Sequence, residues 1–200
     1  MKTIIKAGLL FFLFAAVTSC TKESMKSTIT QSSNQPTAQT TNAEALTVHH
    51  IGDAFGGGVI FYLDATGKHG LIAAKKDIST TGVRWYNKGY VLIGNTLSSI
   101  GTGASNTAKI INKQGNTGSY AAKLCADLVL NGFSDWYLPS RKEIGQMYRN
   151  RSVVPGLQAT NYWSSTEVDL NNAYSEIFNG GFQEVDDKSF TLRVRAVRSF

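Results

Sequence analysis

Residue types that carry out acid–base, nucleophilic or metal chemistry are scarce in this chain of 200 residues. The histidines and cysteines are His49, His50, His69, Cys20 and Cys125. The adjacent histidines could touch a metal ion, but no cysteine or carboxylate cluster follows them at the spacing of a zinc site. The sequence also lacks a nucleophile elbow, a phosphate-binding loop and a nucleophile–base pair. We therefore expect a protein that is not an enzyme, with no catalytic residues, no metal and no cofactor.

The turn Gly101-Thr102-Gly103 lies just before a predicted helix, which is where phosphate-binding turns are found. It lacks the third glycine, the preceding hydrophobic strand and the downstream acid of a dinucleotide-binding fingerprint. We interpret it as the entry of a helix, and a phosphate-binding turn is the alternative.

Basic residues are concentrated in two short segments, at residues 141–151 and 193–198. Their side chains donate charge-assisted hydrogen bonds to sulfate and carboxylate groups, and exposed aromatic rings nearby could stack on sugars. The candidate ligand contacts are Arg141, Lys142, Arg149, Arg151, Arg193 and Arg198. For the first segment, a solvated helix face is the alternative. The formal net charge of +6 is only weak support for a nucleic-acid binder, so we expect no nucleic-acid partner.

The N-terminus has the pattern of a secretory signal. Lys2 and Lys6 precede an apolar stretch at residues 7–17, which is shorter than the roughly 20 residues that a membrane-spanning helix needs. The sequence Val17-Thr18-Ser19-Cys20 then resembles the bacterial lipobox, in which the cysteine is lipidated and becomes the first residue. An ordinary signal peptide with an incidental cysteine is the alternative. Because Thr21 rather than Asp follows, the resemblance implies anchoring in the outer membrane, with display at the cell surface left open.

Composition divides the chain into three parts. Residues 1–19 are the expected lipoprotein signal peptide, and residues 20–46 are the lipidated cysteine and a flexible tether rich in Ser, Thr, Asn and Gln. Such a tether cannot bury enough apolar area to offset its ordering entropy. Residues 47–200 have a globular composition and form one expected domain.

Hydrophobic periodicity predicts three helices in this domain. Two cover residues 104–114 and 119–131, and Cys125 in the second is interpreted as a core thiol rather than a nucleophile. The third opens at Ser140, which has Glu143 at the spacing of a capping box. The expected strands cover residues 59–63, 70–74, 83–86, 162–166, 173–178, 182–185 and 191–200. The pattern predicts an α+β fold with short antiparallel strands and long loops.

Several ordered motifs resemble a bacterial domain family. They are Gly52–Gly58, Lys68–Ala74, Gly132–Ser140 with the helix after it, Tyr162–Glu167 and Val194–Arg198. The family is named for the C-terminal domain of a collagen-like bacterial adhesin, the Lcl C-terminal type, and the resemblance covers about residues 50–200. It implies a C-type-lectin-like fold whose first and last strands pair. The adhesin member is associated with sulfated glycosaminoglycans through a basic surface in an oligomer, which implies adhesion, a glycan ligand and a homo-oligomer as expectations here.

The family motifs match individual positions of this chain. These are Trp136, Leu138, Pro139, Glu143, Trp163, Ser164, Ser165, Glu167, Arg195 and Arg198. The positions interpreted as fold determinants are Trp136, Pro139, Glu143, Trp163, Glu167 and Arg195. We expect both tryptophans to fill the core and Glu167 to form a buried ion pair with Arg195 that sets strand register.

Two activities of related folds do not fit this sequence. Calcium-dependent lectins use a Glu-Pro-Asn or Gln-Pro-Asp tripeptide, and neither occurs here. Formylglycine-generating relatives need active-site cysteines, and only Cys125 remains if Cys20 carries lipid. The expected function is a lipid-anchored cell-envelope module that binds carbohydrate or another polyanion. The alternative is a non-catalytic structural or protein-interaction lipoprotein with an envelope protein as partner, and a hydrolase is a third reading.

Overall fold

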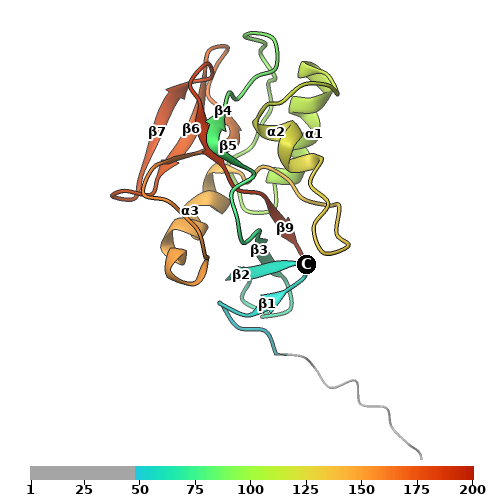
Figure 1. The fold of residues 1–200 in the computed structure, drawn as a ribbon, viewed down its shortest axis with the longest axis vertical. Coiled ribbons are helices and arrows are strands. Elements are labelled where there is room, and N and C mark those ends of the chain that lie inside the picture. Colours follow the sequence, from blue (N-terminus) through green and yellow to red (C-terminus); the bar gives the residue numbers. More distant parts are fainter. Residues whose placement is uncertain (1–47) are drawn as a thin grey trace, which may run out of the picture. The chain divides into compact units, whose positions relative to one another are not determined.

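Two sheets and three α-helices make up residues 48–200, the part of the chain that this computed structural model describes (Figure 1). The predicted signal peptide, the lipidation site at Cys20 and the tether at residues 20–46 lie outside the described residues. The strands are β1 Ala54–Phe55, β2 Gly58–Leu63, β3 Gly70–Ala73, β4 Ser79–Val83, β5 Asn161–Glu167, β6 Asn172–Ile177, β7 Phe182–Asp187, β8 Leu192–Val194 and β9 Val197–Ser199. The helices are α1 Gly103–Gln114, α2 Ala121–Ala126, α3 Arg141–Arg149 and the short 3-10 helix η1 Arg151–Val153. No helix within residues 48–200 has the length and apolar character to cross a membrane.

The strands form one sheet in the order β1-β2-β3-β9 and a second in the order β4-β8-β5-β6-β7. Neighbouring strands are antiparallel except for β5 and β8, which are parallel. In Figure 1 the first sheet lies at the lower end of the domain, with β6 and β7 on one side above it and α1 and α2 on the other. The predicted α+β fold of short, mostly antiparallel strands and three helices is confirmed.

The C-terminal strand does not pair as expected. The family resemblance implies that it pairs with the first strand of the domain, but β9 pairs with β3, the second strand of the β2–β3 hairpin. Ile72 lies opposite Arg198, and the backbone N–H groups of Phe200 and Gly70 donate to each other's carbonyl oxygens at 3.2 Å. The β2–β3 hairpin and the C-terminal strand therefore belong to the same sheet and share its core.

The strand predicted over residues 191–200 is two strands. Arg195 and Ala196 separate β8 from β9, and both are fully buried where the chain crosses from the second sheet to the first. The Arg195 guanidinium donates to the carbonyl oxygens of Ala74 and Pro155, each at 2.8 Å. These hydrogen bonds link the crossing to the segments that contain Ala74 and Pro155. The strand is broken at the crossing because a single straight strand could not belong to both sheets.

The predicted ion pair between Glu167 and Arg195 is wrong. Arg195 Nε donates to Asp77 Oδ1 at 2.8 Å, and Lys188 Nζ donates to Glu167 Oε1 at 2.6 Å. In both pairs the two side chains are at most 5% exposed. Two separate buried ion pairs therefore replace the one that was expected.

The second helix is much shorter than its hydrophobic pattern predicts. It ends at Ala126, and the chain then makes a tight turn at Asn131 and Gly132, with φ values of 53° and 83°. Positive φ at both positions is typical of a type I′ hairpin turn, for which Asn-Gly is a favoured pair. Backbone hydrogen bonds between Leu130 and Phe133 close this turn.

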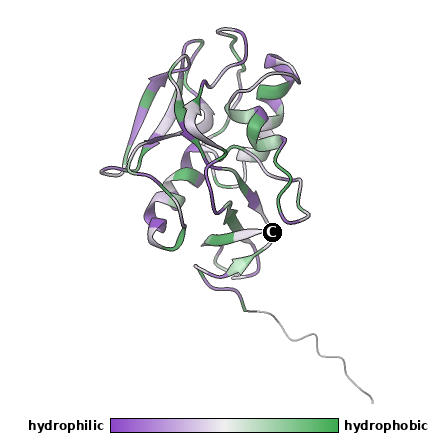
Figure 2. Ribbon diagram, viewed as in Figure 1, coloured by the Kyte–Doolittle hydropathy of each residue, from purple (hydrophilic) through white to green (hydrophobic). Residues whose placement is uncertain are grey.

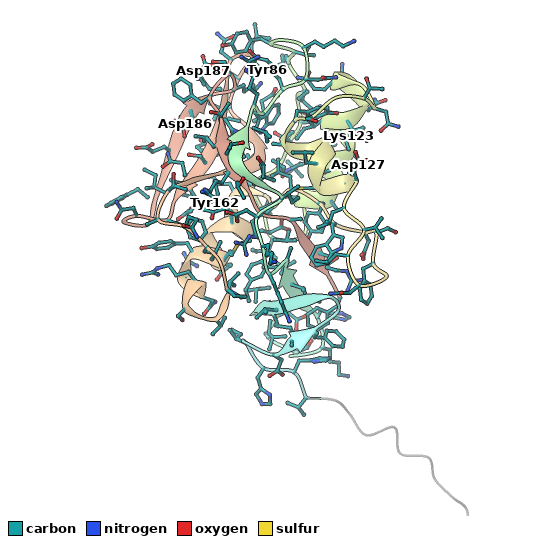
Figure 3. The ribbon with its side chains drawn as sticks, viewed as in Figure 1. Tyr86, Lys123, Asp127, Tyr162, Asp186 and Asp187 are labelled. Atoms are coloured by element: carbon teal, nitrogen blue, oxygen red, sulfur yellow. The ribbon has the colours of Figure 1, made fainter. Side chains whose placement is uncertain are left out.

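The C-terminal end of this helix carries an ion pair. Lys123 and Asp127, four residues apart, form an ion pair on α2, where Figure 3 labels both. Cys125 is fully buried, and desolvation raises the pKa of its thiol well above the usual value. Its interpretation as a core thiol is confirmed.

Tryptophans fill the core as predicted. Trp136 is 2% exposed and Trp163 is fully buried.

The strand predicted over residues 83–86 is wrong, because β4 ends at Val83. Trp85 turns its indole inward, where Nε1 donates to the Ser164 carbonyl oxygen at 2.8 Å. Hydrophobic residues gather on β2 and β3, whereas α3 mixes hydrophilic and hydrophobic residues along its length (Figure 2).

Candidate ligand-binding site

The helix α3 places the first basic segment, and its start is fixed by a capping box. Ser140 N donates to Glu143 Oε2 at 2.7 Å, and Glu143 N donates back to Ser140 Oγ at 3.4 Å. This is the arrangement predicted from the spacing of the two residues. Helical periodicity then buries Ile144 and Met147 and leaves Lys142 and Arg149 exposed.

Glu143 also occupies the N-terminal end of α1. Its side chain is fully buried, and its Oε1 accepts from Gly101 N at 2.7 Å. A side chain at Gly103 would collide with this carboxylate, so Glu143 fills the space beside the first residue of α1. Desolvation raises the pKa of Glu143, opposed by backbone hydrogen bonds from Ser140 and Gly101. The Gly101-Thr102-Gly103 turn is thus a helix entry, as interpreted from the sequence.

The sheet face beneath α3 holds Arg141 in one position. Alternation along β6 puts Tyr174 and Glu176 on the same face, and the register of β6 and β7 puts Gln183 opposite Glu176. The Arg141 guanidinium lies over the Tyr174 ring at 4.0 Å, and its Nε donates to Gln183 Oε1 at 2.5 Å. Gln183 Nε2 donates back to the Arg141 carbonyl oxygen at 2.9 Å. Arg141 is therefore a fixed cation rather than a freely moving one.

A pocket of about 680 Å³ lies between α3, the loop before α1 and the β6–β7 hairpin. Its charged and polar lining includes Arg141, Lys142, Arg149, Tyr148, Glu176 and Gln183. Gly145 faces the same space from the middle of α3, and a Cβ there would lie 3.2 Å from Gln183 Nε2 and 3.8 Å from Glu176 Oε2. A side chain at this position would therefore fill space between α3 and these two residues of the sheet.

The pocket carries two unengaged cations above a buried carboxylate. Within residues 48–200, the side chains of Lys142 and Arg149 make no hydrogen bond and no ion pair. Glu176 is only 2% exposed, and its Oε2 has no hydrogen-bond partner in the part of the chain that the structure describes. Burial raises the pKa of Glu176, while the amide of Gln183 and the positive charges of Arg149 and Arg141 lower it. The site can therefore bind an acidic group at its rim and a hydrogen-bond donor at its floor.

Arg151 lies beside this pocket rather than in it. Its guanidinium lies over the Tyr148 ring at 4.2 Å and donates to the Tyr148 carbonyl oxygen at 3.0 Å. It lines a smaller neighbouring pocket of about 230 Å³ together with Val154 and Phe178.

The second basic segment lies elsewhere and is held by carboxylates. Arg193 donates to Asp77 at 2.9 Å, and Arg198 forms a two-point pair with Asp135 at 2.7 and 2.8 Å. Neither arginine lines the pocket on α3. Of the six candidate contacts, the structure therefore brings together Arg141, Lys142 and Arg149.

Sequence reasoning missed the sheet side of the pocket. Tyr174, Glu176 and Gln183 become neighbours through cross-strand register, which the hydrophobic pattern does not encode. The available signal was Glu176 itself, because glutamate is disfavoured in strands and this one lies in a strand with buried neighbours. Within residues 48–200, no three histidine, cysteine or carboxylate side chains are grouped so that they could hold a metal ion.

Comparison with known proteins identifies the family. No curated protein matches the chain. The family model described as the Lcl C-terminal domain matches residues 77–198, which include α1, α2 and α3, the candidate pocket and both buried ion pairs. The motifs noted at Gly52–Gly58 and Lys68–Ala74 lie before the matched residues. The chain belongs to the Lcl C-terminal domain family.

Proposed function

We propose that this chain is an adhesin-like binding module of the cell envelope, anchored in the outer membrane by lipid on Cys20. In this proposal the pocket between α3 and the β6–β7 hairpin recognises carbohydrate or another polyanionic ligand and carries out no catalysis. Membership of the Lcl C-terminal domain family supports an adhesin-like binding module. The observation that carries the choice of site is the convergence of Arg141, Lys142 and Arg149 on one pocket.

The chemistry of these cations fits an acidic ligand. Arg141 is oriented by Gln183 and Tyr174, so little side-chain entropy is lost when it donates to a ligand. Lys142 and Arg149 are exposed and can meet sulfate or carboxylate groups with charge-assisted hydrogen bonds. Because exposed charges are screened by ions, binding weakens as the salt concentration rises.

The expected result of Lys142→Ala/Arg149→Ala is a loss of affinity for heparin of about tenfold, as two charge-assisted contacts disappear. Dissociation constants are measured for the full-length chain in detergent at two salt concentrations. The matched control is Lys75→Ala/Lys76→Ala, which removes the same charge from two exposed residues outside the pocket. An equal loss in both double variants would reduce the effect to net charge and overturn the proposed site.

Lipid anchoring is tested separately. Cys20→Ala is expected to abolish incorporation of labelled palmitate and to release the chain from the outer-membrane fraction, because a modified Cys20 is the proposed anchor. Fractionation of cells expressing either chain measures the distribution. Membrane association that survives the substitution would rule out the anchor.

A structural or protein-interaction role is the second candidate, and one observation favours it. Strand β7 lies at the edge of the second sheet, with Phe182 67% exposed and Val185 51% exposed. Such an edge can take up a strand or an apolar surface of an envelope protein. Under this alternative, Phe182→Ser/Val185→Ser would abolish capture of a partner, while Lys142→Ala/Arg149→Ala would leave it unchanged.

A further inference from the structure

We infer that the pocket on α3 is selective for a sugar acid, with an acidic group of the ligand at Lys142 and Arg149 and a hydroxyl group donating to Glu176 Oε2. This inference rests on the proposed function and narrows its ligand class. A polyanion without hydroxyl groups would meet the cations of the rim but not the carboxylate of the floor.

The first step concerns the floor of the pocket. Glu176 is 2% exposed, lines the pocket and has an Oε2 atom without a partner within residues 48–200. Buried polar oxygens in proteins nearly always have a hydrogen-bond partner, and leaving a charged one without a partner is costly. A ligand that donates to this oxygen recovers that cost when it binds.

The second step concerns the charge of the floor. Burial raises the pKa of Glu176, and the amide of Gln183 and the positive charges of Arg149 and Arg141 oppose that shift. In its ionised form the carboxylate only accepts hydrogen bonds. It repels an acidic group placed beside it, so the ligand's own charge must lie at the rim. The ligand must therefore carry a donor at some distance from its acid group, which is the arrangement in a sugar that has both hydroxyl and carboxylate groups.

The third step concerns access. Gly145 leaves the approach to Glu176 and Gln183 open, since a methyl group at this position would lie 3.2 Å from Gln183 Nε2 and 3.8 Å from Glu176 Oε2. Gly145 lies inside α3, where glycine is less favourable for the helix than alanine. The helix thus has a residue that is unfavourable for helix stability at a position where a side chain would narrow the floor of the pocket.

The test compares two polycarboxylates of similar length, polygalacturonate with free hydroxyl groups and polyacrylate with none. Glu176→Gln in the full-length chain is expected to weaken binding of polygalacturonate about fivefold to tenfold, because the charge-assisted hydrogen bond is lost. Binding of polyacrylate should stay the same or tighten, because one negative charge is removed from the site. Glu184→Gln is the matched control, since it makes the same change at an exposed position of β7.

A second variant keeps the charge of Glu176. Gly145→Ala is expected to weaken binding of polygalacturonate by a similar factor and to leave binding of polyacrylate to the rim cations unchanged. Thermal unfolding measures whether the variant retains the fold. If Glu176→Gln changes the affinity for polygalacturonate and for polyacrylate no differently from Glu184→Gln, the inference is overturned and the proposed function stands. If wild type binds both polymers no better than Lys142→Ala/Arg149→Ala, the proposed function itself fails.

Discussion

Asp77→Asn is expected to lower the free energy of unfolding by about 3–5 kcal/mol, the cost of removing one partner of a buried ion pair. Asp77 Oδ1 accepts from Arg195 Nε at 2.8 Å, and Oδ2 accepts from Arg193 at 2.9 Å and from the Tyr162 hydroxyl at 2.9 Å. Asparagine preserves the shape of the side chain but leaves the fully buried Arg195 without a counter-charge. Tyr162, labelled in Figure 3, loses a charged acceptor at the same time.

This expected loss is large relative to the total free energy of unfolding of the domain. Domains of this kind have unfolding free energies of about 5–15 kcal/mol, so this one substitution removes about a fifth of the total or more. Urea denaturation followed by tryptophan fluorescence measures it, and the midpoint is expected to fall by about 2 M. The three tryptophans report on the core, since Trp85, Trp136 and Trp163 are all buried.

Arg193→Gln is the control for the same carboxylate. Arg193 also pairs with Asp77, but its side chain is 27% exposed, and Asp77 keeps Arg195 when Arg193 is replaced. We expect a loss of about 1 kcal/mol or less. If Arg193→Gln cost as much as Asp77→Asn, the stabilisation would come from the number of cations paired with Asp77 and not from the burial of Arg195.

Local signals were sufficient for the third helix. The proline, the serine cap and Glu143 lie within five consecutive residues, and each acts on the backbone close to it. Prediction therefore reached both the start of α3 and its exposed cations Lys142 and Arg149. For the same reason the cation side of the candidate pocket could be predicted from the chain alone.

Partner choice could not be predicted, because it depends on contacts between distant segments. Lys188, Arg193 and Arg195 lie within eight residues of one another, and each has a carboxylate partner at least 21 residues away. The sequence offers no rule for which cation reaches Glu167 and which reaches Asp77. The expected pairing of Glu167 with Arg195 is wrong for this reason. Glu176 could not be predicted because the packing of α3 on β6 is what places it in the same pocket as Arg141.

The second helix shows a local signal that was outweighed. Apolar residues continue past Ala126 with helical spacing, but the helix ends there, a tight turn follows at Asn131-Gly132, and Val129 is 71% exposed. Asn-Gly between apolar residues is a strong hairpin signal, and it predicts a turn where the hydrophobic periodicity predicts a helix. The resulting hairpin brings Phe133 beneath Arg198, whose guanidinium lies 4.0 Å from the ring.

The second large effect is expected at the other buried pair. Lys188 is fully buried, and its Nζ donates to Glu167 Oε1 at 2.6 Å, to the Asp169 carbonyl oxygen at 2.7 Å and to the Leu170 carbonyl oxygen at 2.9 Å. Lys188→Met leaves a buried carboxylate and two carbonyl oxygens without this donor, and should cost about 3–5 kcal/mol. Lys123→Met is the control, because the same replacement removes an ion pair whose acid is 55% exposed, with an expected loss below about 1 kcal/mol.

A double-mutant cycle with Glu167→Gln distinguishes a true pair from two independent contributions. Glu167 also accepts from Ile93 N at 2.9 Å and from Gly94 N at 2.7 Å, and Gln can keep only part of this role. The double variant is expected to lose about 2 kcal/mol less than the sum of the single losses, since each substitution removes the penalty left by the other. Strict additivity in urea denaturation would contradict a coupled pair.

The pH dependence of Glu167→Gln gives a second readout of the same coupling. Burial lowers the pKa of Lys188, and Glu167 opposes this by hydrogen bonding and by its charge, so removing Glu167 lowers that pKa further. Between the lowered pKa and the usual value near 10.5 the unfolded chain binds more protons than the folded one, so stability rises with pH in that window. Glu167→Gln should therefore recover part of its loss as the pH is raised from 7 to 9, whereas Lys188→Met, which has no amine to titrate, should not. A deficit of Glu167→Gln relative to wild type that stays constant over this range would show that Lys188 remains charged without its partner.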